Sequence, residues 1–317
     1  MMNHKIKRLS AAEEALLTKE ELAKYYEEIV SYYKKAPINL LYLAFVKLIR
    51  KALVKMAAKM GDYEIVYLND LEVPEGGCII ATNHKGFNDL PILLEAVEEP
   101  FFVLAASDVP MPLMLRIIFK LLGAITLDRA NKEEKEEALE RASKISARGY
   151  TVAYYPEAVN NFMGTALLYH FWPGIIDNAK NANKPILPIA TFDKDGKVYV
   201  RYGKPYKVNP WDNREIAASM LRDEIASLLW DIWEIFPPIT REEAVRTYQA
   251  PGLTVGKLTF NPEYESQFIY RPKNPYSPDN ERELTMDEVT DINRNIKISK
   301  SEGIHEIAYH DYKDFDL

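Results

Sequence analysis

Short apolar runs that alternate with helical segments constrain the fold of this chain more than any other feature. Residues 77–82 form an uninterrupted apolar stretch after a Pro-Glu-Gly-Gly turn, which is typical of a strand buried on both faces. The other candidate strands are 63–67, 101–105, 124–127, 151–155, 186–190 and 198–201. Helical patterns separate several of them, at 90–97, 110–122 and 133–148. Strands that alternate with helices predict an α/β fold with a largely parallel central sheet flanked by helices.

A polar loop follows the first buried strand and reads Asn-His-Lys-Gly-Phe-Asn-Asp over residues 83–89. Asn88 or Asp89 is a suitable N-cap for the helix that follows. On a continuous helix His84 and Asp89 would lie about 140° apart. With His84 in a loop and Asp89 at the helix start, the chain can fold back and bring the carboxylate to the imidazole.

Such a pair has a definite chemistry. A carboxylate on one imidazole nitrogen fixes the tautomer and leaves the other nitrogen free to take a proton from a substrate hydroxyl. The sequence contains no Gly-x-Ser-x-Gly elbow, so the expected nucleophile is a hydroxyl or an amine of the substrate. The alternative is that Asp89 only caps the helix and His84 is an ordinary loop residue.

Polar residues from three segments are predicted to meet at one edge of the sheet. His84, Arg129 and Glu157 each fall one to three residues past a predicted strand end. In open α/β sheets, ligands bind outside the carboxyl ends of the strands. The sequence therefore predicts a site at this edge.

Four sequence blocks carry a family resemblance. Besides Asn-His-x4-Asp, they are Gly-Ala-Ile-Thr-Leu-Asp-Arg at 123–129, Tyr-Tyr-Pro-Glu-Ala-Val-Asn-Asn at 154–161 and Lys-Pro-Ile-Leu-Pro-Ile-Ala at 184–190. In this order they resemble the blocks of the glycerolipid acyltransferase family, which includes glycerol-3-phosphate, 1-acylglycerol-3-phosphate and lysophospholipid acyltransferases. The resemblance covers roughly residues 63 to 205.

The resemblance implies a function in phospholipid biosynthesis or remodelling. An acyl group would move from an acyl-carrier-protein or CoA thioester, as co-substrate, to a hydroxyl of a lyso-glycerolipid such as 1-acylglycerol-3-phosphate or a lysophospholipid. It implies that His84 is the general base and that Asp89 orients and stabilises the imidazolium, with backbone amides of the same loop as candidate oxyanion donors. The candidate substrate-binding residues are Arg129, Glu157, Asn160 and Lys85. No bound cofactor and no metal is expected, since no His/Cys/Asp cluster has ligand spacing.

The third block departs from the family pattern, because Asn160 stands where the family has Arg. Replacing a bidentate cation by a neutral amide removes a contact worth roughly 1.5–3 kcal/mol. Either Lys85 or a distant Arg substitutes, or the acceptor lacks a terminal phosphate monoester, as in a head-group-substituted lysophospholipid, a lysoglycolipid or an amine. A catalytically silent, lipid-binding member of the fold is a further alternative.

Residues 37–60 raise the question of a membrane. Lysines at 47, 51, 55 and 59 form a row among apolar residues, and no uncharged run reaches the roughly 18 residues of a spanning helix. The segment is either a basic amphipathic helix in the headgroup plane or a core-packing helix with a Lys-rich outer face. The resemblance favours the first, and with it a peripheral location on the cytoplasmic face of the cell membrane.

The sequence predicts three parts of the chain. They are an N-terminal helical, membrane-associating segment at 1–61, an acyltransferase domain at 62–238 and a partly packed C-terminal extension at 239–317. Residues 11–35 are expected to form a solvated helix with a Leu/Tyr stripe. The net charge of −7 argues against a nucleic-acid partner. The single cysteine, Cys78, is predicted to be a core residue of a cytosolic protein, which has no visible signal peptide at its start.

Overall fold

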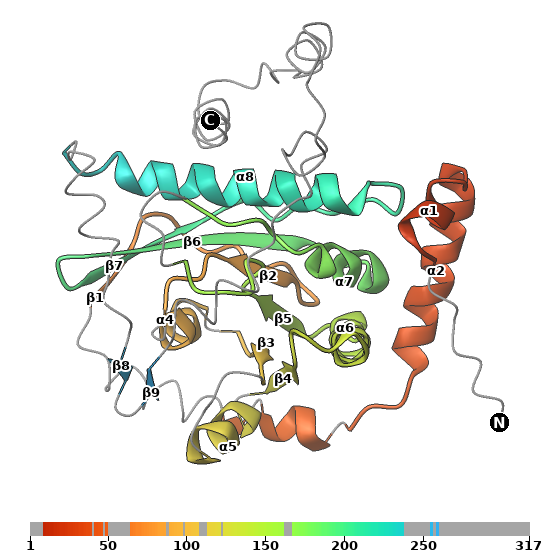
Figure 1. Cartoon of the computed structure of the whole chain (residues 1–317), viewed down its shortest axis with the longest axis horizontal. Helices are drawn as coiled ribbons and strands as arrows, with labels where there is room; N and C mark the ends of the chain where they lie inside the picture. Colours follow the sequence, from red (N-terminus) through yellow and green to blue (C-terminus); the bar gives the residue numbers. More distant parts are fainter. Residues whose placement is uncertain are drawn as a thin grey trace, which may run out of the picture.

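A seven-stranded sheet organises the structure, a computed structural model (Figure 1). The strands are β1 Glu64–Tyr67, β2 Ile79–Thr82, β3 Phe101–Ala106, β4 Ala124–Leu127, β5 Thr151–Tyr154, β6 Ile186–Lys194 and β7 Lys197–Tyr202. They lie in the order β1-β7-β6-β2-β5-β3-β4. All neighbouring pairs are parallel except the β6–β7 hairpin. The predicted α/β fold with a largely parallel sheet is confirmed.

The structure describes residues 9–39, 41–46, 48–49, 64–86, 89–97, 99–107, 113–121, 123–161, 167–237, 254–255 and 258–259. Most of the predicted membrane segment and of the C-terminal extension lies outside these ranges. Of the extension, two short strands are described, β8 Thr254–Val255 and β9 Leu258–Thr259.

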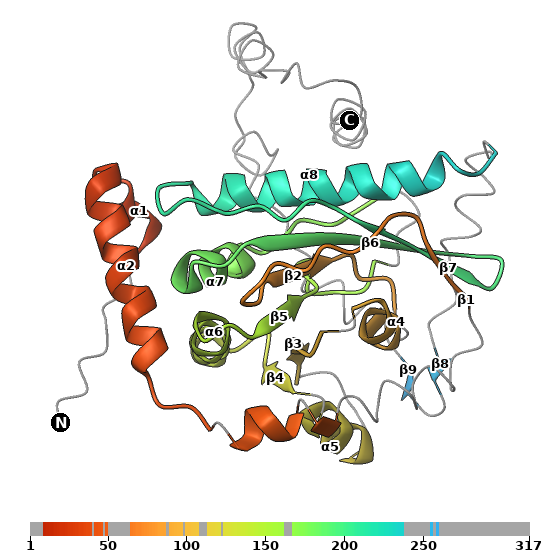
Figure 2. The same cartoon turned by 180° about the vertical axis from the view of Figure 1, so that it is seen from behind.

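Helices cover both faces of the sheet (Figures 1 and 2). The helices α6 Lys132–Ala147, α7 Gly174–Ala182 and α8 Arg214–Trp233 pack on one face, and α4 Asp89–Ala96 packs on the other. Asparagines begin two of them: the side chains of Asn131 and Asn213 accept hydrogen bonds from the first backbone amides of α6 and α8. The helix α5 Leu113–Leu121 precedes the edge strand β4.

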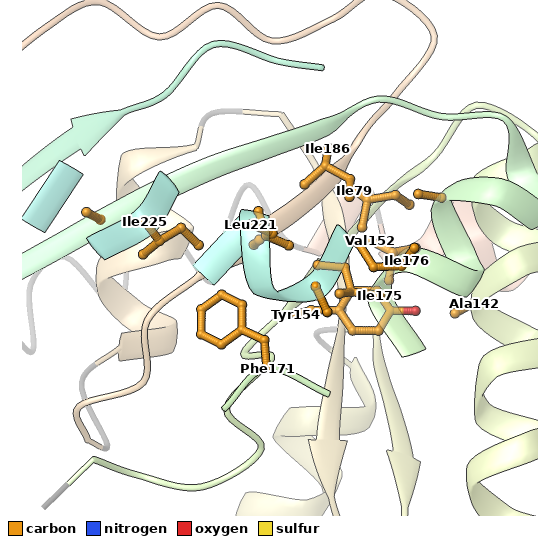
Figure 3. Close-up of a cluster of buried hydrophobic side chains, with 14 of the residues drawn as sticks. Ile79, Ala142, Val152, Tyr154, Phe171, Ile175, Ile176, Ile186, Leu221 and Ile225 are labelled. Carbon is orange, nitrogen blue, oxygen red and sulfur yellow. The ribbon is translucent and has the colours of Figure 1, made fainter. Parts of the chain in front are cut away.

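Covered faces explain why the central strands are apolar without alternation. In β2, Ile79 packs in the cluster beneath α7 and α8, which Figure 3 shows, whereas Ile80 packs in the cluster beneath α4. Cys78 is fully buried in the α4 cluster, and burial raises the pKa of its thiol to about 11. It is a core residue, as predicted.

The N-terminal helices differ from the prediction in two respects. The segment forms two helices, α1 Ala11–Glu14 and α2 Lys19–Lys35, because Thr18 and Glu21 form a capping box that starts a new helix. The Leu/Tyr stripe is buried against Ala147 and Ala182, at the ends of α6 and α7. The expectation of a solvated helix is therefore wrong for this face of α2.

Residues 41–46 and 48–49 are helical, but the side chains of Lys47, Lys51, Lys55 and Lys59 lie outside the described residues. Within the part of the chain that is described, no helix is long and apolar enough to cross a membrane.

Gly77, at the turn into β2, tests the packing that sets the position of this strand. Its φ is +83°, and a Cβ there would lie 2.5 Å from the carbonyl oxygen of Gly149. We expect Gly77→Ala to lower the free energy of unfolding by more than about 2 kcal/mol, from backbone conformation and overlap together. Gly196→Ala is the matched control: its φ is +75° but no atom lies near its Cβ, so about 1 kcal/mol is expected. Equal losses of unfolding free energy in Gly77→Ala and Gly196→Ala, measured by urea unfolding, would contradict the predicted overlap at residue 77.

Candidate active site

The loop after β2 wraps around the first residue of α4. The imidazole Nδ1 of His84 lies 2.7 Å from Oδ2 of Asp89, and the same oxygen accepts from the backbone amides of Lys85 at 2.6 Å and Gly86 at 2.9 Å. Asp89 is buried, whereas the His84 side chain is 25% exposed. The predicted contact between imidazole and carboxylate is confirmed.

This contact sets the tautomer of His84. An ionised carboxylate can only accept hydrogen bonds. The proton of the neutral ring therefore lies on Nδ1, which donates a hydrogen bond to Asp89. In the neutral imidazole Nε2 then has a free lone pair, as a general base requires.

Two further side chains hold the imidazole in place. Asn83 clamps the end of β2 to β6: its Nδ2 donates to the carbonyl of Thr191 at 3.0 Å and its Oδ1 accepts from the Thr191 amide at 2.9 Å. The ring of Tyr155 lies against the His84 ring, with centroids 4.5 Å apart. Sequence reasoning assigned no role to either, although both directly follow strands whose ends meet here.

Glu157 joins the loop after β2 to two parts of the connection between β5 and α7 from inside the protein. Its side chain is fully buried; Oε1 accepts from the His84 amide at 2.9 Å and Oε2 from the Tyr169 amide at 2.8 Å. Burial raises the pKa of Glu157 to about 7, although both amide hydrogen bonds favour the ionised form. These contacts give Glu157 a positioning function within the predicted site.

The remaining predicted residues also gather at this edge. Arg129 Nη1 donates to the carbonyl of Ala158 at 2.9 Å. Lys85 Nζ lies 4.1 Å from the centroid of the Phe192 ring. Burial lowers the pKa of Lys85 to about 8, although the Asp193 and Asp89 carboxylates favour its charged form.

Asn160 lies in the loop after β5. Ala158 there adopts a left-handed conformation with φ 60°, and the amide of Asn161 donates to the carbonyl of His84 at 2.8 Å. Asn160, between Ala158 and Asn161 in sequence, is buried. The loops after β2, β4 and β5 thus converge at one edge of the sheet, as predicted.

The geometry revises one expectation about the oxyanion. The backbone amides of His84, Lys85 and Gly86 all donate to Glu157 or Asp89. They stabilise the resting site, so these three amides are not available as oxyanion donors in this arrangement. Phe87 and Asn88 lie outside the described residues.

Comparison with known proteins identifies the domain. A family model described as "Acyltransferase" matches residues 64–191. Residues 64–191 are an acyltransferase domain of the glycerolipid acyltransferase family. The acyltransferase domain includes all the predicted site residues and the Asn83–Thr191 clamp.

A solved structure is also similar to this chain. It is the crystal structure of the 1-acyl-sn-glycerophosphate (LPA) acyltransferase PlsC from Thermotoga maritima, with a TM-score of 0.47 and 18% sequence identity. The match covers 69% of this chain and 98% of that chain. A comparison with curated protein sequences found no significant match.

The position of Glu157 leads to a stability prediction. Glutamine has a single acceptor oxygen, so in Glu157→Gln one of the two backbone amides would face an NH2 group. We expect a loss of about 1–3 kcal/mol in urea unfolding at pH 5, where the wild-type protein does not carry the cost of an ionised buried carboxyl group. An unchanged midpoint and slope would contradict the two contacts.

The same carboxyl group predicts a pH dependence. Its folded-state pKa of about 7 exceeds the ordinary 4.5, so the folded protein binds more protons than the unfolded chain between these values. The contribution of Glu157 to stability therefore falls as pH rises from about 4.5 to about 7 and is constant above. Unfolding free energies of wild type and Glu157→Gln across this range measure it; a difference independent of pH would contradict the raised pKa.

Proposed function

We propose that this protein transfers a fatty acyl group from an acyl-carrier-protein or CoA thioester to a hydroxyl of a lyso-glycerolipid. The acyltransferase domain supports acyl transfer as the reaction class. The observation that carries the proposal is the contact of Asp89 with His84 Nδ1, because it leaves Nε2 unprotonated on a partly exposed ring.

In the proposed reaction, Nε2 of His84 takes the proton of the acceptor hydroxyl as its oxygen attacks the thioester carbonyl. Asp89 stabilises the imidazolium that forms, because it already accepts from Nδ1. The tetrahedral intermediate then expels the thiolate, which receives the proton from Nε2. The products are the acylated lipid and a free thiol.

The surrounding contacts support these functions. The carboxylate of Asp89 is held by two backbone amides as well as by the imidazole, so its orientation does not depend on His84 alone. Arg129 and Lys85 supply cations at the same edge, and both remain proposed substrate-binding residues.

Removal of the base tests the reaction. A positioned general base contributes about 10²–10⁴-fold, so His84→Ala should lower the rate of thiol release by at least this factor. Asp89→Asn should lower it too, because an amide in this place no longer stabilises the imidazolium. Release would be measured separately from acyl-CoA and from acyl-acyl-carrier-protein, with detergent-dispersed lysophospholipids.

Full activity of His84→Ala would contradict the proposed mechanism. Binding of liposomes by wild type without thiol release from either donor would instead indicate a lipid-binding protein that has lost turnover.

We also propose that the protein binds the cytoplasmic face of the cell membrane peripherally. The helical residues 41–46 and 48–49 lie beside α5 in both views (Figures 1 and 2), and the Tyr42 hydroxyl donates to the carbonyl of Lys120. Large apolar side chains are exposed on both helices, and we infer that they form one apolar patch: Leu41, Phe45, Leu48, Leu113 and Ile117. Arg116 and Lys120 are exposed on α5 beside it, which suits an anionic lipid surface.

Charge placed within the apolar patch tests membrane binding. Because burial of one large aliphatic side chain is worth up to about 1.5–3 kcal/mol, Leu48→Glu with Ile117→Glu should weaken sedimentation with anionic vesicles at least about tenfold. Ile216→Glu, on the exposed face of α8 at the opposite end of the molecule, is the control. Equal loss in both variants would contradict the assignment to this patch.

A further inference from the structure

A buried acceptor atom without a partner lies in the loop after β5, whose backbone contacts the backbone of the proposed base. Asn160 is 6% exposed, and its Oδ1 has no hydrogen-bond partner in the described structure. Buried side-chain oxygens nearly always have one. Such an atom is accounted for if a ligand supplies the missing donor.

The position of Asn160 connects it with the reaction. The next residue, Asn161, donates its amide to the carbonyl of His84 at 2.8 Å. Two residues before Asn160, the carbonyl of Ala158 accepts from Arg129 at 2.9 Å. The loop that carries Asn160 therefore contacts both the backbone of His84 and the side chain of Arg129.

The two side chains differ in what they require of a ligand. A guanidinium only donates hydrogen bonds, whereas the Oδ1 atom of an asparagine only accepts them. A group that suits both must combine acceptor oxygens with an O–H or N–H donor. A phosphate monoester above pH 7 is a dianion with acceptors alone, because its second pKa is about 6. A phosphodiester whose alcohol retains a free hydroxyl has both.

We propose that Asn160 selects the acceptor head group by accepting a hydrogen bond from its hydroxyl. The acceptor class is then a lysophospholipid in which a phosphodiester carries a hydroxylated alcohol. This inference rests on the proposed acyl transfer and narrows its substrate.

Three acceptors with the same acyl chain separate the effect of a head-group hydroxyl from the effect of the phosphate charge. Lysophosphatidylglycerol has a diester and head-group hydroxyls, lysophosphatidylcholine has a diester without a head-group donor, and lysophosphatidic acid is a monoester. Thiol release by the full chain at pH 8 should give a kcat/KM for lysophosphatidylglycerol about tenfold or more above that for lysophosphatidylcholine. Lysophosphatidic acid should be no better than lysophosphatidylcholine.

Substitution assigns the preference to Asn160. Asn160→Leu should abolish the advantage of lysophosphatidylglycerol over lysophosphatidylcholine in kcat/KM. Asn181→Leu is the matched control, because Asn181 is also 6% exposed but bonds Ser143 between α6 and α7. It should lower stability and leave the ratio between the two acceptors unchanged.

Several outcomes would overturn the inference. They are equal kcat/KM for the two diesters in wild type, a preference for lysophosphatidic acid, or an unchanged ratio in Asn160→Leu. If Asn160→Leu does not fold, the inference is tested by the ratio of kcat/KM between the two phosphodiester acceptors, measured in wild type and in Asn160→Ser. Absence of His84-dependent thiol release with all three acceptors is a different result, since it rejects the proposed acyl transfer itself.

Discussion

One oxygen atom, Oδ2 of Asp89, determines the geometry of this site. This atom lies at the start of α4. It accepts hydrogen bonds from the His84 ring and from the consecutive backbone amides of Lys85 and Gly86 in the preceding loop. The amides fix the carboxylate, and the carboxylate in turn fixes the imidazole. A negative charge at a helix N-terminus is also favoured by the helix dipole. The same carboxylate therefore both holds the loop before α4 and orients the base.

The other loops depend on the position of this one. Glu157 accepts the His84 amide and thereby connects the loop after β5 with the loop after β2, while Asn83 connects β2 with β6. Parallel strands make this possible, because their carboxyl ends meet at one edge. The same convergence places carboxylates and cations close together. Burial at this edge raises the pKa of Glu157 and lowers the pKa of Lys85, although the amide hydrogen bonds of Glu157 and the carboxylates near Lys85 favour the charged forms.

Sequence patterns predicted the sheet and the His84–Asp89 contact because both depend on local order: apolar runs, their separation and the residues directly after them. They could not predict contacts made by backbone amides, which every residue except proline carries. The function of Glu157 in joining loops was missed for this reason. The burial of α2 was missed because its Leu/Tyr stripe packs on helices more than 100 residues away in the chain. The unpartnered oxygen of Asn160 likewise requires a structure.

The proposed mechanism depends on which nitrogen of the His84 imidazole carries the proton, and NMR can measure this directly. In protein labelled with 15N-histidine, the two imidazole nitrogens of His84 distinguish the tautomers at pH 8. The account predicts a proton on Nδ1 and an unprotonated Nε2, with this preference weakened in Asp89→Asn. A proton on Nε2 in the wild-type protein would contradict it, because His84 could then not act as the base for an acceptor hydroxyl.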